Sequence, residues 1–208
     1  MGTLRTLLAI TVVLSHTYGH IFLGGRLAVQ MFYIISGFLI SYILVEANSY
    51  ENKKKFYFNR FLRLFPAYYF VSIITLLFFI YLYLIGKDTF FSSFYNIDIY
   101  GKIYFVITNF LILGQDIAFF TGVKNGIFQP MINYSDSEII IYNGLISSVT
   151  WTLSLEIMFY LIAPFIIKNR IVLFIILFLS IILRVILIYI SLVLNLSDHI
   201  YLGNFDHL

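Results

Sequence analysis

The sequence contains no cysteine, only three prolines and few charged residues. Without cysteine the chain has no disulfide, no thiol nucleophile and no cysteine metal ligand. Charged residues make up 11% of the 208 residues, about half the share in a typical soluble domain. Apolar residues make up 61%, which excludes a disordered chain, and the net charge of +3 is too small to indicate a nucleic-acid partner. The composition therefore predicts a polytopic membrane protein.

Six apolar segments are predicted to form an all-α bundle of transmembrane helices. One span takes about 20 helical residues, so the chain accommodates about six spans in one domain, residues 1–208. The fourth segment is the shortest, because Gly114, Gln115 and Asp116 interrupt its apolar run. The six segments are Leu4–Leu23, Leu27–Val45, Ala67–Ile85, Ile103–Leu113 (stretching to Phe120), Leu145–Ile167 and Ile171–Leu196.

Basic residues gather in the connection between the second and third segments, Glu46–Pro66. They are Lys53, Lys54, Lys55, Arg60 and Arg63. Because loops rich in Lys and Arg stay on the cytoplasmic side, this connection and the N-terminus are predicted to be cytoplasmic, in the plasma (inner) membrane. Lys168 and Arg170 also reach the cytoplasm if the fourth segment is a re-entrant or interfacial helix.

The first segment carries two ionisable residues, Arg5 and His16, eleven residues apart. Eleven residues are almost three helical turns, so both side chains project from one face, about 16 Å apart along the axis. Ionisable residues inside a span usually face a cavity or a partner. A histidine there can take a proton from a hydroxyl at neutral pH, so His16 is a candidate general base. The alternative is a hydrogen bond from His16 to a neighbouring helix.

Arg60 and Arg63 are three residues apart, so on a helix their guanidinium groups share a face. Permanently charged, planar guanidinium groups suit phosphate. The alternative is a juxtamembrane anchor that fixes orientation or binds anionic lipid. Spacing alone favours the anchor.

Two further polar positions lie inside apolar segments. Glu156 is near the middle of the fifth segment and Arg184 near the middle of the sixth, so in antiparallel neighbours they could form an ion pair. Ser36 and Gly37 form a small, polar spot in the second segment, where a neighbouring helix or an acyl chain can approach closely. Helix packing is the favoured role of that spot.

Taken in order, four motifs resemble the N-terminal part of acyltransferase family 3. Members of this family are integral-membrane O-acyltransferases that commonly modify bacterial cell-surface glycans. The motifs extend over nearly the whole chain. They are Leu4-Arg5 with His16, the stretch from Gly25 to Leu39, Arg60-Phe-Leu-Arg63 with Phe65-Pro66, and Trp151-Thr-Leu-Ser154-Leu-Glu156 with Phe159-Tyr160.

The resemblance implies transfer of an acyl group, usually from acetyl-CoA as a co-substrate, to a hydroxyl of a glycan or lipid-linked glycan. It implies no metal and no permanently bound cofactor. It also implies roles for nine residues: His16 and Glu156 as catalytic groups, Arg5, Arg60 and Arg63 as donor-binding groups, and Ser36, Gly37, Trp151 and Ser154 as residues that shape the site. A covalent acyl-enzyme through Ser36 or Ser154 ranks below direct transfer, because neither serine lies in a nucleophile elbow.

The chain departs from the family in length. Members usually have about ten helices, so a chain of about six is expected to be incomplete at its C-terminus. Two alternatives to an active enzyme stay open. One is a proton- or solute-coupled transporter, with Arg5, His16, Glu156 and Arg184 along its path. The other is an inactive fragment or a non-catalytic membrane subunit.

Overall fold

The computed structural model describes residues 2–18, 24–46, 52–87, 90–131 and 136–193. The chain forms two compact units. The first unit contains Met1–Lys53 and Ile162–Leu208, and the second contains Lys54–Leu161. This division into units does not test the predicted single domain, residues 1–208, which stays a prediction.

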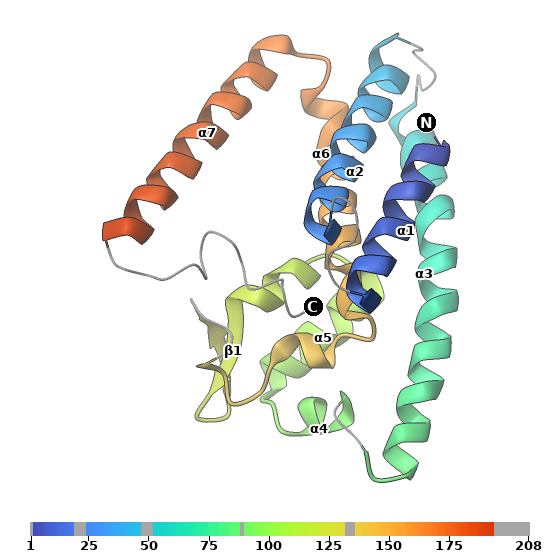
Figure 1. Cartoon of the computed structure of the whole chain (residues 1–208), viewed down its shortest axis with the longest axis vertical. Helices are drawn as coiled ribbons and strands as arrows, with labels where there is room; N and C mark the ends of the chain where they lie inside the picture. The colour runs from blue at the N-terminus through green and yellow to red at the C-terminus, as the bar shows by residue number, and fades with distance from the viewer. Residues whose placement is uncertain (1, 19–23, 47–51, 88–89, 132–135, 194–208) are drawn as a thin grey trace. The chain divides into compact units, whose positions relative to one another are not determined.

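The first unit begins with two packed helices, α1 (Gly2–Tyr18) and α2 (Gly24–Ser41), which lie side by side (Figure 1). A π-helical turn, Tyr42–Glu46, extends α2. The helices approach closely near Gly25, where an added Cβ would lie 2.5 Å from Ser15 Oγ. Small residues permit such close approach between apolar helices. The first two predicted segments are thus confirmed as helices over their described residues, and 19–23 lie outside that part.

Helix α3 spans Lys53–Leu84 and is much longer than the predicted segment Ala67–Ile85. The expectation of a connection up to Pro66 is wrong from Lys53 onward, because those residues continue the helix and Pro66 lies inside it. Lys, Arg and Leu are good helix formers. The buried residues of α3 also follow a single stripe, at intervals of four residues or a multiple of four: Phe56, Arg60, Tyr68 and Ser72.

The region of the fourth predicted segment is broken, as Gly114 to Asp116 indicated. A short helix α4 (Phe90–Tyr95) precedes α5 (Ile99–Leu111), and a 3-10 helix follows at Gln115–Phe120. The 13 residues of α5 extend about 20 Å, less than the roughly 30 Å of a bilayer core. The break occurs at Ile112 and Gly114, which have positive φ angles of 67° and 82°.

A small β-hairpin follows, which the all-α prediction did not include. Strands β1 (Thr121–Lys124) and β2 (Ile127–Pro130) pair antiparallel. Asn125 and Gly126 link them with φ angles of 53° and 74°, as in a type I′ turn. The Glu138 carboxylate accepts hydrogen bonds from both turn N–H groups, at 2.8 and 3.2 Å. Apart from this hairpin, the regular structure of the described residues is helical.

The last two described helices are α6 (Trp151–Ile166) and α7 (Arg170–Val193). The fifth segment was predicted to begin at Leu145, but short 3-10 turns precede Trp151. By length and composition three described helices can cross a membrane: Leu27–Glu46, Lys53–Leu84 and Arg170–Ile190. Helices α1, α5 and α6 are apolar but shorter. The prediction of about six spans therefore exceeds the three long helices of the described chain.

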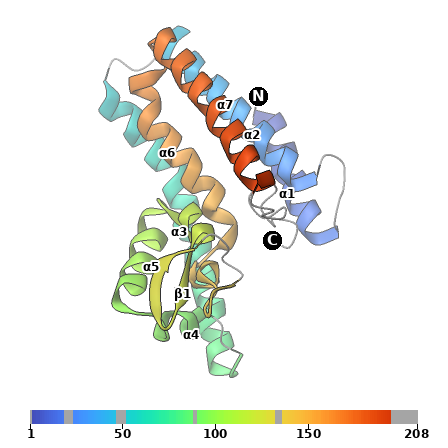
Figure 2. The same cartoon turned by 90° about the vertical axis from the view of Figure 1, so that its left-hand side faces the viewer.

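Among its described residues, the second unit has two apolar clusters. Figure 2 shows α4, α5 and the hairpin gathered together. Their shared cluster includes Phe105 of α5, and Gly144 lies so close to it that an added Cβ would be 2.2 Å from the Phe105 ring. The other cluster joins Tyr68 of α3, Ile112 after α5 and Ile157 of α6. This second cluster brings α3 and α6 together, and both helices carry predicted site residues.

Candidate functional site

In the first unit, Arg5 of α1 reaches across to α2. Its Nη2 donates a hydrogen bond of 2.5 Å to the Oγ of Ser36, which is buried. The guanidinium carbon lies 4.4 Å from the centroid of the Phe32 ring, within cation–π distance. The structure therefore brings together two residues predicted separately, Arg5 and Ser36, with half-buried Gly37 next in the chain. This supports helix packing as one role of the small, polar spot.

His16 lies in α1, eleven residues after Arg5, so the backbone has the predicted helical spacing. The His16 side chain lies outside the part of the chain that the structure describes. The role of His16 as a general base therefore stays a prediction.

In the second unit, Arg60 of α3 is 9% exposed and lies between two aromatic rings. Its guanidinium carbon is 5.4 Å from the Phe56 centroid and 5.2 Å from the Tyr160 centroid. Arg63 is exposed, although only three residues separate it from Arg60. One arginine of the pair is thus held in place by its neighbours, whereas the other projects away from the packed stripe of α3.

Glu156 is also buried, one turn before Tyr160 on α6. The Tyr160 hydroxyl donates a hydrogen bond to Glu156 Oε1. Tyr160 therefore contacts a cation with its ring and a carboxylate with its hydroxyl. The predicted pairing of Glu156 with Arg184 would join the two units, and it stays a prediction.

Ser154 is completely buried at the start of α6. Its Oγ donates to Asp116 Oδ1 at 2.8 Å and accepts from the backbone N–H of Gly114 at 2.9 Å. One turn earlier, Trp151 meets Phe119 edge to face, with ring centroids 5.6 Å apart. These contacts tie the first turn of α6, the helix that carries Glu156, to the broken region after α5. The predicted site-shaping roles of Ser154 and Trp151 stay predictions.

A polar network includes Gly114, Gln115 and Asp116, which were expected only to interrupt an apolar run. The Gln115 side chain is fully buried; its Oε1 accepts a 2.5 Å hydrogen bond from Thr150 Oγ1 and its Nε2 donates to the Thr108 carbonyl at 3.1 Å. Polar residues within an apolar run are expected to have partners. Two polar residues inside an apolar run, Gln115 and Asp116, were therefore the sequence feature that could have predicted this network.

Tyr104 of α5 also belongs to this network. Helix α5 is too short to span a bilayer. The Tyr104 hydroxyl donates to the Gly114 carbonyl at 2.8 Å. Burial raises the pKa of Tyr104 above its usual range, and the negative charge of Asp116 raises it further. Tyr104 therefore remains a neutral hydrogen-bond donor at physiological pH and helps to hold the broken region in place.

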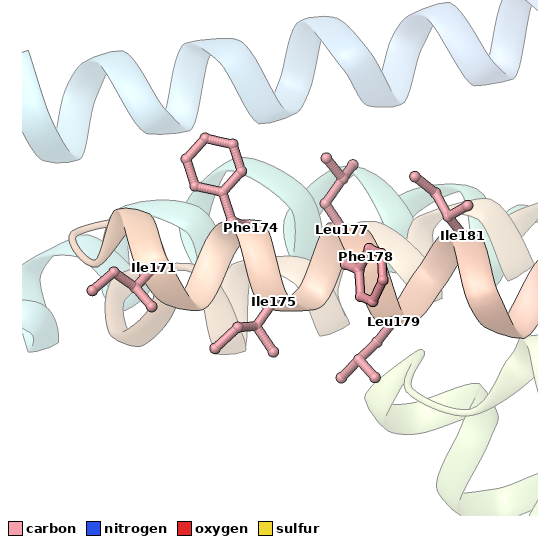
Figure 3. Close-up of a pocket in the computed structure, with 7 residues that line it drawn as sticks. All are labelled: Ile171, Phe174, Ile175, Leu177, Phe178, Leu179 and Ile181. Atoms are coloured by element: carbon pink, nitrogen blue, oxygen red, sulfur yellow. The ribbon is translucent and has the colours of Figure 1, made fainter.

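A shallow apolar hollow on α7 lies outside these clusters (Figure 3). Its seven lining residues carry only hydrocarbon side chains, so it offers no group that binds phosphate or transfers a proton. They are Ile171, Phe174, Ile175, Leu177, Phe178, Leu179 and Ile181. Among the described residues, guanidinium groups lie over aromatic rings at Arg5 and at Arg60.

Both arginines, Arg5 and Arg60, lie in apolar helices and contact aromatic rings. A model of acyltransferase family 3, described as an acyltransferase domain, matches residues 2–207. The match covers nearly the whole chain, and the chain belongs to this family of membrane acyltransferases.

Among characterised proteins, the chain is similar to the peptidoglycan O-acetyltransferase OatA of Listeria monocytogenes serovar 1/2a. The two are 26% identical over 171 residues, which make up 77% of this chain and 22% of that protein. The chain therefore spans a minor part of this relative's length. No solved structure matches the chain.

Proposed function

We propose that the chain acts as a membrane O-acyltransferase, which moves an acyl group, acetyl in the first instance, from acyl-CoA to a hydroxyl of a cell-surface polysaccharide or other glycan. The proposal is carried by one observation: the Arg60 guanidinium, a permanent cation, is held between two aromatic rings. Arg60 lies within the residues that the family model matches. The name of the similar OatA protein, a peptidoglycan O-acetyltransferase, supports both the acetyl group and the glycan acceptor.

The donor side of the reaction rests on the arginines. Coenzyme A carries several phosphate groups, and guanidinium groups bind phosphate through paired N–H donors. Arg60 is held in place, while Arg63 is exposed on the same helix. Arg5 is the third proposed donor-binding group. Loops and helix ends rich in Lys and Arg stay on the cytoplasmic side, so we place Lys53–Lys55, the N-terminus and the donor there.

The proposed chemistry is direct acyl transfer. The acceptor hydroxyl gives its proton to His16 as its oxygen attacks the thioester carbonyl, and the tetrahedral intermediate expels the CoA thiolate. The ester stays on the glycan, and the proton passes from His16 to the thiolate. General-base help of this kind contributes about 10² to 10⁴ in rate. Glu156 is the second proposed catalytic group, because a buried carboxylate hydrogen-bonded by Tyr160 can accept a further hydrogen bond from a reacting group.

Direct transfer is favoured over a covalent intermediate on Ser154 by the setting of that serine. Ser154 is fully buried, and its hydroxyl is already used in two hydrogen bonds that hold α6. A nucleophile must reach the acyl carbon, and these bonds keep Ser154 inside the packed network.

The proposal is tested with the purified chain in detergent micelles, radiolabelled acetyl-CoA and soluble peptidoglycan fragments as acceptor. Ester formation and CoA release are expected, and His16→Ala should lower the rate at least about 100-fold. Thr17→Ala is the matched control, because the Thr17 hydroxyl only bonds the Val13 carbonyl of its own helix. Equal rates in His16→Ala and the native chain contradict the proposal.

The two other functions give different results. A transporter produces proton-coupled flux in liposomes without consuming the thioester. A non-catalytic subunit shows neither activity and becomes stable only with a second chain.

A further inference from the structure

We propose that Tyr160 is a positioning residue that holds Arg60 and Glu156 in one arrangement, with its ring against the donor-binding cation and its hydroxyl on the catalytic carboxylate. This inference rests on the proposed function and adds to it a residue with two separable tasks. It comes from contacts within the second unit alone.

The contacts of Tyr160 define the two tasks. Its ring lies 5.2 Å from the Arg60 guanidinium carbon, within the range of cation–π attraction. Its hydroxyl donates to Glu156 Oε1. Tyr160 is 4% exposed and Glu156 is 6% exposed, so water competes little with either contact.

Tyrosine suits this position because it combines an aromatic face with a polar end. Glu156 and Tyr160 are four residues apart on α6, so their side chains lie on one face of that helix. Phe56, four residues before Arg60 on α3, presents a second ring to the guanidinium at 5.4 Å. The arginine is thereby restrained from two sides before any phosphate reaches it.

The register between α3 and α6 is fixed beside this cluster. The Tyr57 hydroxyl donates to the carbonyl of Leu161 at 2.9 Å, one residue after Tyr160. This bond holds the two helices at the level where the ring meets the arginine. A long, flexible Arg side chain loses rotamer freedom when it binds phosphate, and a side chain already restrained loses less.

The two tasks predict different kinetic effects. Loss of the hydroxyl removes one hydrogen bond from the carboxylate but leaves a ring against Arg60, so kcat falls while KM for the donor stays constant. Loss of the ring also removes one of the two cation–π contacts of Arg60, so KM for the donor rises as well. A residue that merely fills space would change both constants together or neither.

The experiment measures kcat and KM for acetyl-CoA in the full chain, with peptidoglycan fragments as acceptor. Tyr160→Phe is expected to lower kcat about tenfold, with KM within about twofold of the native value. Tyr160→Leu is expected to lower kcat similarly and to raise KM about tenfold. Two matched controls should retain native constants: Tyr69→Phe, whose hydroxyl bonds the Phe110 carbonyl, and Phe58→Leu, which removes an exposed ring of α3.

Native constants in both Tyr160 variants overturn the inference and leave the proposed function intact. If the native chain itself produces no ester, the proposed function fails, and a second measurement decides whether Tyr160 joins the two groups. That measurement is a thermal-unfolding double-mutant cycle of Tyr160→Phe with Glu156→Gln, and another of Tyr160→Leu with Arg60→Gln. Non-additive shifts in both cycles support the arrangement, and additive shifts in either cycle overturn it.

Discussion

Arg5 in the first unit and Arg60 in the second both lie over aromatic rings, but their surroundings differ. Arg5 is half-buried and donates to the hydroxyl of Ser36, with Phe32 as its ring partner. Arg60 is buried between Phe56 and Tyr160, and Tyr160 in turn binds Glu156. A desolvated cation over two rings is restrained more strongly than a partly exposed one. The comparison indicates that Arg60 has the more fixed position of the two.

Two close glycine contacts, one from each unit, also differ. In the second unit, Gly144 lies against the rigid ring of Phe105, whereas in the first unit Gly25 lies against the small side chain of Ser15. A ring inside a packed cluster cannot move aside without displacing its neighbours, whereas a serine hydroxyl can rotate. A glycine-to-alanine substitution should therefore have unequal effects at these two positions.

The largest expected effect is that of Gly144→Ala, which should lower the free energy of unfolding by about 3 kcal/mol. The added Cβ would lie 2.2 Å from the Phe105 ring, so the cluster must shift. Thermal unfolding of the detergent-solubilised chain measures the change. Combining Gly144→Ala with Phe105→Leu should cost less than the two separate losses together; strict additivity would show that the ring is not the obstacle.

Arg60→Gln should raise KM for acetyl-CoA about 30-fold, equivalent to about 2 kcal/mol. Arg5→Gln should raise it about fivefold, because Arg5 is only half-buried. Lys87→Gln, an exposed cation after the end of α3, should leave KM unchanged. Steady-state kinetics at constant acceptor concentration decides the order, and a larger effect at Arg5 would reverse the comparison between the units.

Ser154→Ala should lower the free energy of unfolding by about 1.5 kcal/mol, because Asp116 and the Gly114 N–H both lose a buried partner. Thr11→Ala is the control, since the exposed Thr11 hydroxyl only bonds the Leu7 carbonyl of its own helix. The two unfolding midpoints are compared under one detergent condition. Similar midpoints for both variants would mean that the network around Gly114 adds little to stability.

The smallest effect is expected for Gly25→Ala, about 0.5–1 kcal/mol in unfolding free energy. The nearest atom to the new Cβ is Ser15 Oγ, which can rotate away. Ser15→Ala in the same chain should remove most of the loss, as thermal unfolding would show. A cost equal to that of Gly144→Ala would mean that the α1–α2 contact is as rigid as the cluster around Phe105.

Much of the fold was predictable from hydrophobic runs. Six apolar segments correspond to helices α1, α2, α3, α5, α6 and α7. The ends of the helices were less predictable, because they depend on local contacts. The sequence predicted a connection up to Pro66, but α3 already begins at Lys53. It also predicted a helix from Leu145, but a short 3-10 turn, Ser148–Thr150, precedes α6. The hairpin was not predicted, although Asn125-Gly126 is typical of a hairpin turn.

The site was predictable in its residue types but not in its contacts. The motifs singled out Arg5, Arg60 and Glu156, and their roles in the reaction stay predictions. They assigned Tyr160 no task and counted Gln115 and Asp116 only as a break in a helix. Contacts between residues far apart in the chain, such as Arg60 with Tyr160, leave no periodic pattern along the sequence. Only the packing of α3 against α6 reveals them.

The sequence by itself determined that this chain belongs in a membrane, which regions become helices and which family it resembles, because hydrophobicity and motif order are properties of the chain. Only the tertiary structure decided that Arg60 is buried while Arg63 is exposed, and that Ser154 braces a helix. Burial and hydrogen-bond partners arise when separate segments meet, so they depend on three-dimensional packing rather than on the identity of any one residue.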